Sequence, residues 1–149
     1  MSRISLAIVS FAALLWASAC TPTDPADFIG TWQYQAGSVV TTSCSGVPND
    51  SDPLTGNVTI TQGTASALNV TYGSCTARFD AGNNNSVNLV AGTGCFNNFG
   101  FTGTGTSVSG TYTLSGDGNT LTERQSASFN VLFVSCSINV EGTLMRVSL

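Results

Sequence analysis

Alternation of apolar and polar residues is the feature that most constrains the fold of this chain. From Phe28 onward, Thr, Ser, Asn, Gly and Val recur with a period of two, and turn residues interrupt the pattern roughly every 8–12 residues. No long window has the periodicity of a helix. The apolar members of each stretch share one face: Val58 and Ile60; Leu68, Val70 and Tyr72; Ala77 and Phe79; Val108, Tyr112 and Leu114; Ile138, Val140 and Leu144. The pattern predicts an all-β sandwich or barrel.

Two short segments rich in Gly and Asn predict hairpin turns. They are Gly82–Asn85 and Ser115–Asn119. Gly and Asn adopt positive φ at little cost, which tight turns between strands require. Residues 92–105, which include Cys95 and three phenylalanines, form the longest irregular stretch. We expect this stretch to be a loop at the mouth of a barrel.

The N-terminus has the layout of a secretory signal peptide. Arg3 supplies a positive charge, Ile4–Leu15 is almost entirely apolar, and Ala17–Ala19 offers small residues for a peptidase. A transmembrane helix is the alternative, but it needs about 20 apolar residues, and this run is shorter. A plain cleavage site would leave Cys20 as a free thiol in an exported chain, which is an unusual arrangement.

Leu14–Cys20 resembles the lipobox of bacterial lipoproteins, which are cleaved before the cysteine. Ala17 stands where that family usually has Leu. The resemblance implies a diacylglycerol thioether on the Cys20 sulfur and, in many bacteria, an acylated amine. Two or more acyl chains hold a protein stably on a membrane. Thr21, and not Asp, follows the cysteine, which in enteric-type sorting directs a lipoprotein to the outer membrane. We therefore expect a lipid-anchored protein of the bacterial cell envelope.

These features divide the chain into three parts. Residues 1–19 are the predicted signal peptide, 20–27 a lipidated tether and 28–149 a single β-barrel domain. The length of the last part suits one domain. Seven tether residues beyond Cys20 reach at most about 23 Å when extended, so the domain is expected to stay close to the bilayer.

The charge of the chain limits its partners. Lys is absent, and after removal of the signal peptide three arginines stand against eight acidic residues, which gives a net charge near −5. Nucleic-acid-binding proteins need a basic face, so no nucleic acid is expected as a partner. Electrostatic docking on anionic lipid is disfavoured for the same reason, which leaves the acyl chains as the expected link to the membrane.

Few residues could carry catalysis or bind a metal. The chain has no His, which is the commonest general base and metal ligand, and no G-x-S-x-G motif. Asp50 and Asp52 lie in a stretch that reads as an exposed turn, and Asp80, Glu123 and Glu141 are expected on the solvent-exposed surface. We predict no catalytic residue, no metal site and no cofactor, and expect that the protein is not an enzyme.

The cysteine count depends on the anchor. Lipidation uses Cys20 and leaves four cysteines, an even number that in an exported domain predicts two disulfides. Three pairings are possible. A zinc site is disfavoured, because C-x₂-C spacing is absent and the compartment is oxidising. The four are Cys44, Cys75, Cys95 and Cys136.

Phe28–Trp32 resembles the F-x-G-x-W opening of the lipocalin and avidin-like barrels. In that superfamily the Trp plugs the closed end of an eight-stranded barrel, and in lipocalins an Arg of the last strand packs across its ring. Arg146 is the only candidate for that Arg here. The resemblance implies a small antiparallel up-and-down β-barrel of about eight strands, preceded by the N-terminal signal helix. Trp32 is the only Trp of the mature chain, so the several tryptophans of the avidin ligand cage are missing.

One cysteine pairing fits such a closed barrel. First and last strands of an eight-stranded meander run antiparallel. If Cys44 and Cys136 are opposed and bonded, paired residue numbers sum to 180, and Tyr34 lies opposite Arg146 with Trp32 as a diagonal neighbour. The second bridge then joins the remaining two cysteines, Cys75 and Cys95.

Of three possible functions an enzyme is the least favoured, and no ligand-binding residues are assigned for the other two. The first, which the sequence favours over the second, is an envelope lipoprotein whose barrel binds a small apolar ligand under the loop at 92–105. The second is a structural or protein-interaction lipoprotein whose barrel is filled by its own side chains and contacts an envelope partner or a basic protein. Small acidic lipoproteins that inhibit cationic host lysozymes are one example of the second kind.

Overall fold

A computed structural model describes residues 23–64, 67–93, 105–131 and 133–149 of the chain. Pro25–Phe28 forms a short 3₁₀ helix, η1. Ten strands follow, all joined in one sheet: β1 (Gly30–Tyr34), β2 (Val39–Cys44), β3 (Asp50–Pro53), β4 (Asn57–Gln62), β5 (Leu68–Tyr72), β6 (Cys75–Ala81), β7 (Ser86–Leu89), β8 (Gly105–Leu114), β9 (Thr120–Val131) and β10 (Val134–Ser148).

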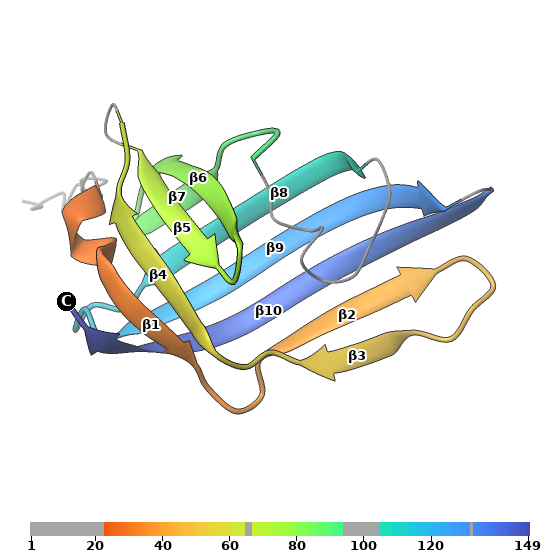
Figure 1. Cartoon of the computed structure of the whole chain (residues 1–149), viewed down its shortest axis with the longest axis horizontal. Coiled ribbons are helices and arrows are strands. Elements are labelled where there is room, and N and C mark those ends of the chain that lie inside the picture. Colours follow the sequence, from red (N-terminus) through yellow and green to blue (C-terminus); the bar gives the residue numbers. More distant parts are fainter. Residues whose placement is uncertain (1–22, 65–66, 94–104, 132) are drawn as a thin grey trace, which may run out of the picture.

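The ten strands make a closed antiparallel barrel of eight (Figure 1). The long strand β10 pairs with β2 through its first half and with β1 through its second half. In the same way β3 pairs with β2 and β4 pairs with β1. Each of the pairs β1–β2 and β3–β4 therefore acts as one interrupted long strand. The barrel closes where β1 meets β10, which confirms the predicted up-and-down architecture.

Alternating burial confirms the period-two pattern. In β4, β5, β6 and β10 the predicted apolar positions face the interior, and the residues between them face solvent. The predicted turn at Gly82–Asn85 separates β6 from β7, and Asn84 and Asn85 both have positive φ, 56° and 54°. The predicted turn at Ser115–Asn119 separates β8 from β9. The loop expected within 92–105 lies mostly outside the described residues.

The register predicted from the disulfide holds along β2 but is wrong by two residues along β1. Trp32, and not Tyr34, lies directly opposite Arg146. The shift arises because Gln35–Ser38 makes a turn between β1 and β2, where Gly37 has a φ of 92°. Glycine adopts this conformation without the steric cost of a side chain. The turn lets the first strand bend while both of its halves stay paired with β10.

The N-terminal segment from Thr23 is part of the barrel domain. Thr23 is buried, and its hydroxyl accepts a hydrogen bond from the Ser86 backbone N–H (3.1 Å). Asp24 caps η1 by accepting from the Ala26 N–H (2.9 Å), and Phe28 is fully buried. The structure therefore places residues 23–27, which the sequence assigned to the tether, on the barrel. The predicted signal helix and Cys20 lie outside the described residues.

Among the described residues, none of the helical segments has the length and apolar character that crossing a membrane requires.

The barrel has two distinct ends (Figure 1). The helix end comprises η1, the β8–β9 turn and the C-terminal residue Leu149. The hairpin end comprises the β2–β3 turn (residues 45–49) and the tip of the β9–β10 hairpin at Phe133. Large apolar side chains that are exposed in the described part of the chain lie at these two ends: Val47, Phe133 and Val134 at the hairpin end, Met145, Val147 and Leu149 at the helix end.

Candidate functional site

Glu123 is the one charged residue that the described part of the chain buries, with 2% of its surface exposed. The expectation that it lies on the surface was wrong. It follows Leu121 by two positions on β9 and precedes Phe129 by six, and both of these side chains are buried. Because alternate residues of a strand share a face, the sequence did contain the signal that Glu123 points into the barrel.

Three donors surround the Glu123 carboxyl. The Tyr34 hydroxyl donates to Oε2 (2.5 Å), the Tyr112 hydroxyl donates to Oε1 (2.8 Å), and the Gln125 side-chain amide also donates to Oε1. Burial raises the pKa of Glu123, and these donors offset part of that rise. Burial, followed by the nearby Glu123 charge, also raises the pKa of both tyrosines, so their hydroxyls keep their protons and act as donors.

Gly142 makes room for this cluster from the neighbouring strand. It lies directly opposite Glu123 across the β9–β10 pair. A Cβ at position 142 would lie 2.9 Å from Cε1 of Tyr34 and 3.0 Å from Oε2 of Glu123. Contacts this short force neighbouring atoms to move. A glycine at this position therefore allows the tyrosine ring and the carboxyl to meet.

The space beside this cluster is small. The cavity has a volume of about 20 Å³, and its lining is Tyr34, Val70, Tyr72, Ala77, Phe79, Tyr112, Glu123 and Gln125. A single buried water needs roughly 10–15 Å³ on this scale, whereas ligand pockets measure roughly 300–1,000 Å³. Around the cavity, aromatic rings pack edge to face. The ring centres of Tyr34 and Tyr72 are 5.8 Å apart, and those of Phe79 and Tyr112 are 5.0 Å apart. This part of the interior is packed with the chain's own side chains.

The described residues show no arrangement for metal binding. They contain no cluster of three or more His, Cys, Asp or Glu side chains. The Glu123 carboxyl can exchange a proton, but the cavity beside it admits nothing larger than a water molecule. Asp50 and Asp52 are both exposed, as expected, but the expected turn was wrong, because both residues lie in the strand β3 and pair with β2.

The structure brings together Trp32 and Arg146, the two residues predicted to pack at one end of the barrel. The guanidinium carbon lies 4.2 Å from the centre of the buried Trp32 ring, a cation–π geometry. The Trp32 indole N–H donates to the Phe28 carbonyl (2.9 Å). The guanidinium also donates to three backbone carbonyls, those of Ile29 (2.8 Å), Asp27 (2.5 Å) and Gly118 (3.1 Å). Arg146 thus fastens η1 and the β8–β9 turn over the helix end.

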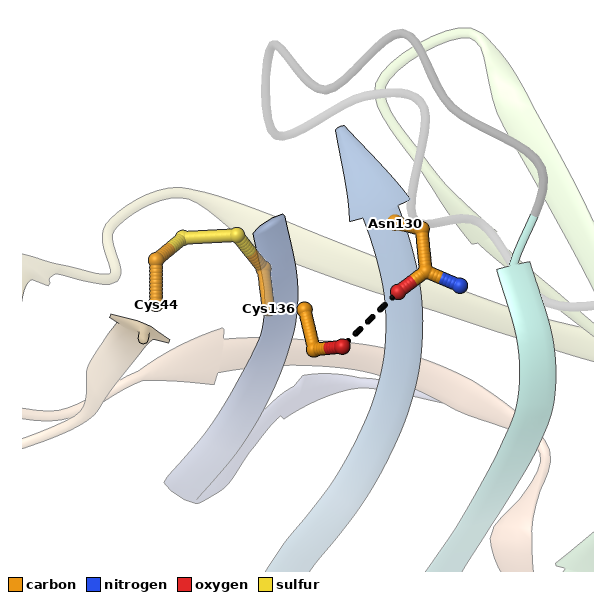
Figure 2. The surroundings of a disulfide bond; sticks show 4 residues. Cys44, Asn130 and Cys136 are labelled. Atoms are coloured by element: carbon orange, nitrogen blue, oxygen red, sulfur yellow. Dashed lines mark hydrogen bonds between the residues drawn. A yellow bond between two sulfur atoms is a disulfide. The ribbon is translucent and has the colours of Figure 1, made fainter. Parts of the chain in front are cut away.

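The predicted disulfide between Cys44 and Cys136 is confirmed (Figure 2). It joins β2 to β10, with 4.1 Å between the two Cα atoms. Cys75 is disulfide-bonded too. Its predicted partner, Cys95, lies outside the described residues, so this pairing stays a prediction, as does lipidation of Cys20.

The hairpin end carries an apolar tip that was not predicted from the sequence. Phe133 is fully exposed, and Val134 is 37% exposed. Val47, 58% exposed, lies on the neighbouring β2–β3 turn, which is tied to β10 by a hydrogen bond from the Ser45 N–H to the Ser135 carbonyl (3.0 Å). Val131 pairs with Val134, so two residues connect β9 to β10. Such short connections favour Gly and Asn, and the bulky apolar residue there was the available signal.

Polar groups surround this tip. Below it, the Ser135 hydroxyl donates to Oδ1 of Asn130 (3.0 Å), a bond that links the two arms of the hairpin (Figure 2). A surface hollow of about 620 Å³ lies over the ends of β2, β9 and β10. Its lining is Ser43, Cys44, Ser45, Ser128, Phe129, Asn130, Ser135, Cys136 and Ser137. The hairpin end therefore combines an apolar tip with a concave surface rich in hydroxyl groups.

No family model, curated protein or solved structure matches this chain. Its function is therefore inferred from the residues and their geometry.

Proposed function

We propose that the protein is a non-enzymatic lipoprotein of the bacterial cell envelope whose filled barrel is a rigid scaffold for contact with a protein partner. The observation that carries this proposal is the contrast between interior and surface. The cavity beside Glu123 has about 20 Å³, while Phe133, Val134 and Val47 are exposed together at one end of the barrel. A carrier needs space inside, and an interaction protein needs an apolar surface outside.

The proposed lipid anchor determines how the exposed apolar residues of the hairpin end are oriented relative to the membrane. The signal-like N-terminus and Cys20 support lipidation, and the chain enters the barrel at the helix end. Between Val134 and Arg146, β10 runs for twelve residues, a length of about 40 Å at the usual rise of a strand. The hairpin end therefore lies far from the anchor and faces away from the membrane that holds the protein.

The charge around the hairpin end favours a basic partner. Asp50 and Asp52 are the charged residues of β2, β3 and the turn between them, and both are exposed. The β9–β10 hairpin has no charged residue from 126 to 140. An apolar centre with acidic groups beside it complements a cleft with a basic rim, because opposite charges speed association and set the orientation of binding.

Native mass spectrometry of the detergent-extracted full-length protein, with and without reductant, tests the proposal first. We expect a mature chain that begins at a lipidated Cys20, contains two disulfides and carries no bound small molecule. A co-purifying apolar molecule of defined mass would instead support the ligand-binding barrel, the function that the sequence favours. An unlipidated chain would contradict the proposed anchor.

Binding to lysozyme, a cationic protein, tests the partner class. We expect saturable binding at low salt that weakens as salt rises, because surface charges are screened. Phe133→Ser and the double variant Asp50→Asn/Asp52→Asn should each weaken binding about tenfold or more. Asp80→Asn, which removes an exposed charge on β6, is the matched control and should leave binding unchanged. Absence of binding, or equal binding by all variants, contradicts this partner.

A further inference from the structure

The folded domain reaches closer to Cys20 along the chain than the predicted tether of residues 20–27 implied. Thr23 is 7% exposed and hydrogen-bonded to β7, so the folded domain includes the third residue after Cys20. Three residues span at most about 11 Å. An extended tether from 20 to 27 would have reached about twice as far. If Cys20 carries acyl chains in a bilayer, the helix end of the barrel lies at the surface of that bilayer.

An apolar stripe lies at this same end. Met145, Val147 and Leu149 are 49%, 56% and 94% exposed, and alternate residues of a strand point to one side. Farther along the outward face of β10 the residues are polar: Thr143, Glu141 and Asn139. On the outward face of β10, exposed large apolar side chains thus occur only near its C-terminal end, and Leu149 follows directly after the strand. This end of β10 and the C-terminus lie near η1 (Figure 1).

The helix end also contains a hollow of about 390 Å³ with charges of both signs. Asp27 and Asp117 supply carboxylates, and Arg146 supplies a guanidinium. A hydrogen bond from the Ser115 hydroxyl, the largest cause, holds the pKa of Asp117 below its usual range. A zwitterionic phospholipid headgroup also carries charges of both signs, so each of its charges has an opposite charge in the hollow.

We propose that the helix end is a membrane-contact surface that rests on zwitterionic phospholipid, with Met145, Val147 and Leu149 in the interfacial region. The inference rests on the proposed lipidation of Cys20. Asp24, Asp27 and Asp117 cluster at this end against the single Arg146. This balance disfavours an anionic surface. Seated in this way, the barrel stands upright and holds its hairpin end away from the bilayer.

Depth-dependent quenching of tryptophan fluorescence tests the proposal. The lipidated full-length protein is reconstituted into vesicles of phosphatidylcholine and phosphatidylethanolamine that contain brominated lipid. Leu149→Trp and Phe133→Trp are compared, since both replace exposed residues at opposite ends and both retain the buried Trp32 as the same background. We expect roughly threefold greater quenching of the new Trp at 149 than at 133, because interfacial side chains lie within the headgroup and acyl boundary.

Equal quenching at the two positions, or greater quenching at 133, would overturn the proposal. The triple variant Met145→Ser/Val147→Ser/Leu149→Trp should lose most of the quenching at 149 although its lipid anchor is intact. Unchanged quenching contradicts a role for the apolar stripe.

Replacing half of the phosphatidylcholine with phosphatidylglycerol should reduce quenching, and an increase contradicts the preference for zwitterionic lipid. The mass of the same sample separates the two proposals: an unlipidated Cys20 refutes the anchor, whereas a lipidated chain without quenching refutes only the contact surface.

Discussion

At the scale of single residues, burial in the barrel interior changes the pKa of Glu123. Removing a carboxylate from water is costly, and the donors Tyr34, Tyr112 and Gln125 recover part of that cost. Burial remains the larger effect, so the pKa of Glu123 is raised. The folded protein therefore holds a proton on this group over a pH range in which the unfolded chain has lost it.

This difference in pKa predicts a pH dependence of stability. The contribution of Glu123 is fully present below its unfolded pKa, near 4.5, and is lost as pH rises through the raised folded pKa. We expect Glu123→Gln to remove this decline, so that the free energy of unfolding of the wild type falls relative to the variant between acidic and neutral pH. Urea unfolding across a pH series measures the difference. Glu141→Gln, an exposed change on β10, is the control, and parallel curves for wild type and Glu123→Gln would falsify the prediction.

Arg146 is a second residue whose role depends on its shape as well as its charge. Its planar guanidinium stacks on Trp32 and donates to three carbonyls, and the single ammonium of Lys cannot reproduce this arrangement. We expect Arg146→Lys to lower the free energy of unfolding by about 2 kcal/mol, the value of one or two lost hydrogen bonds to a charged group. Arg78→Lys, at an exposed position of β6, should change stability little. Equal stability of the two variants in urea would contradict a fastening role for Arg146.

At the scale of elements, the Cys44–Cys136 disulfide holds β2 onto the long strand β10 across a sequence separation of 92 residues. A crosslink that closes so long a loop restricts the unfolded chain strongly, so we expect Cys44→Ala/Cys136→Ala to cost about 4 kcal/mol. Ser43→Ala/Ser137→Ala is the matched control, because these residues form the adjacent pair on the same two strands. Urea midpoints and slopes of both double variants measure the effect. A cysteine variant as stable as the serine variant would refute this contribution.

The sequence predicted elements well where local rules decide them. Period-two alternation located β4, β5, β6 and β10, and the Gly- and Asn-rich segments located two turns. The same alternation could have placed Glu123 inside, but the general rarity of buried carboxylates outweighed it. The register of β1 could not be predicted, because it depends on how the turn at Gln35–Ser38 bends the first strand, and that bend is set by pairing with β10.

At the scale of the whole molecule, fewer features can be predicted from the sequence than at the scale of elements. Whether a barrel is hollow depends on how side chains from distant strands pack together, and no local pattern measures that volume. The sequence also did not predict which residues lie together at each end of the barrel. Phe133 and Val47 are far apart in the sequence and lie at the same end of the barrel because β2 pairs with β10. Thr23 read as part of a tether until its contact with Ser86 placed it on the barrel.

The close packing around Glu123 predicts how the barrel responds to a new cavity. Phe79 is fully buried, lines the cavity of about 20 Å³ and packs edge-to-face on Tyr112. We expect Phe79→Ala to cost about 3–5 kcal/mol and to create an apolar space that binds benzene, as engineered apolar cavities do. Wild-type protein should show no such binding, measured by the shift of Tm on saturation with benzene and by NMR chemical shifts of the core. Phe79→Leu, which leaves less space, serves if the alanine variant does not fold. Equal binding of benzene by the wild type would mean that the barrel already contains a ligand-sized space, and the carrier function would then replace the scaffold proposed for this protein.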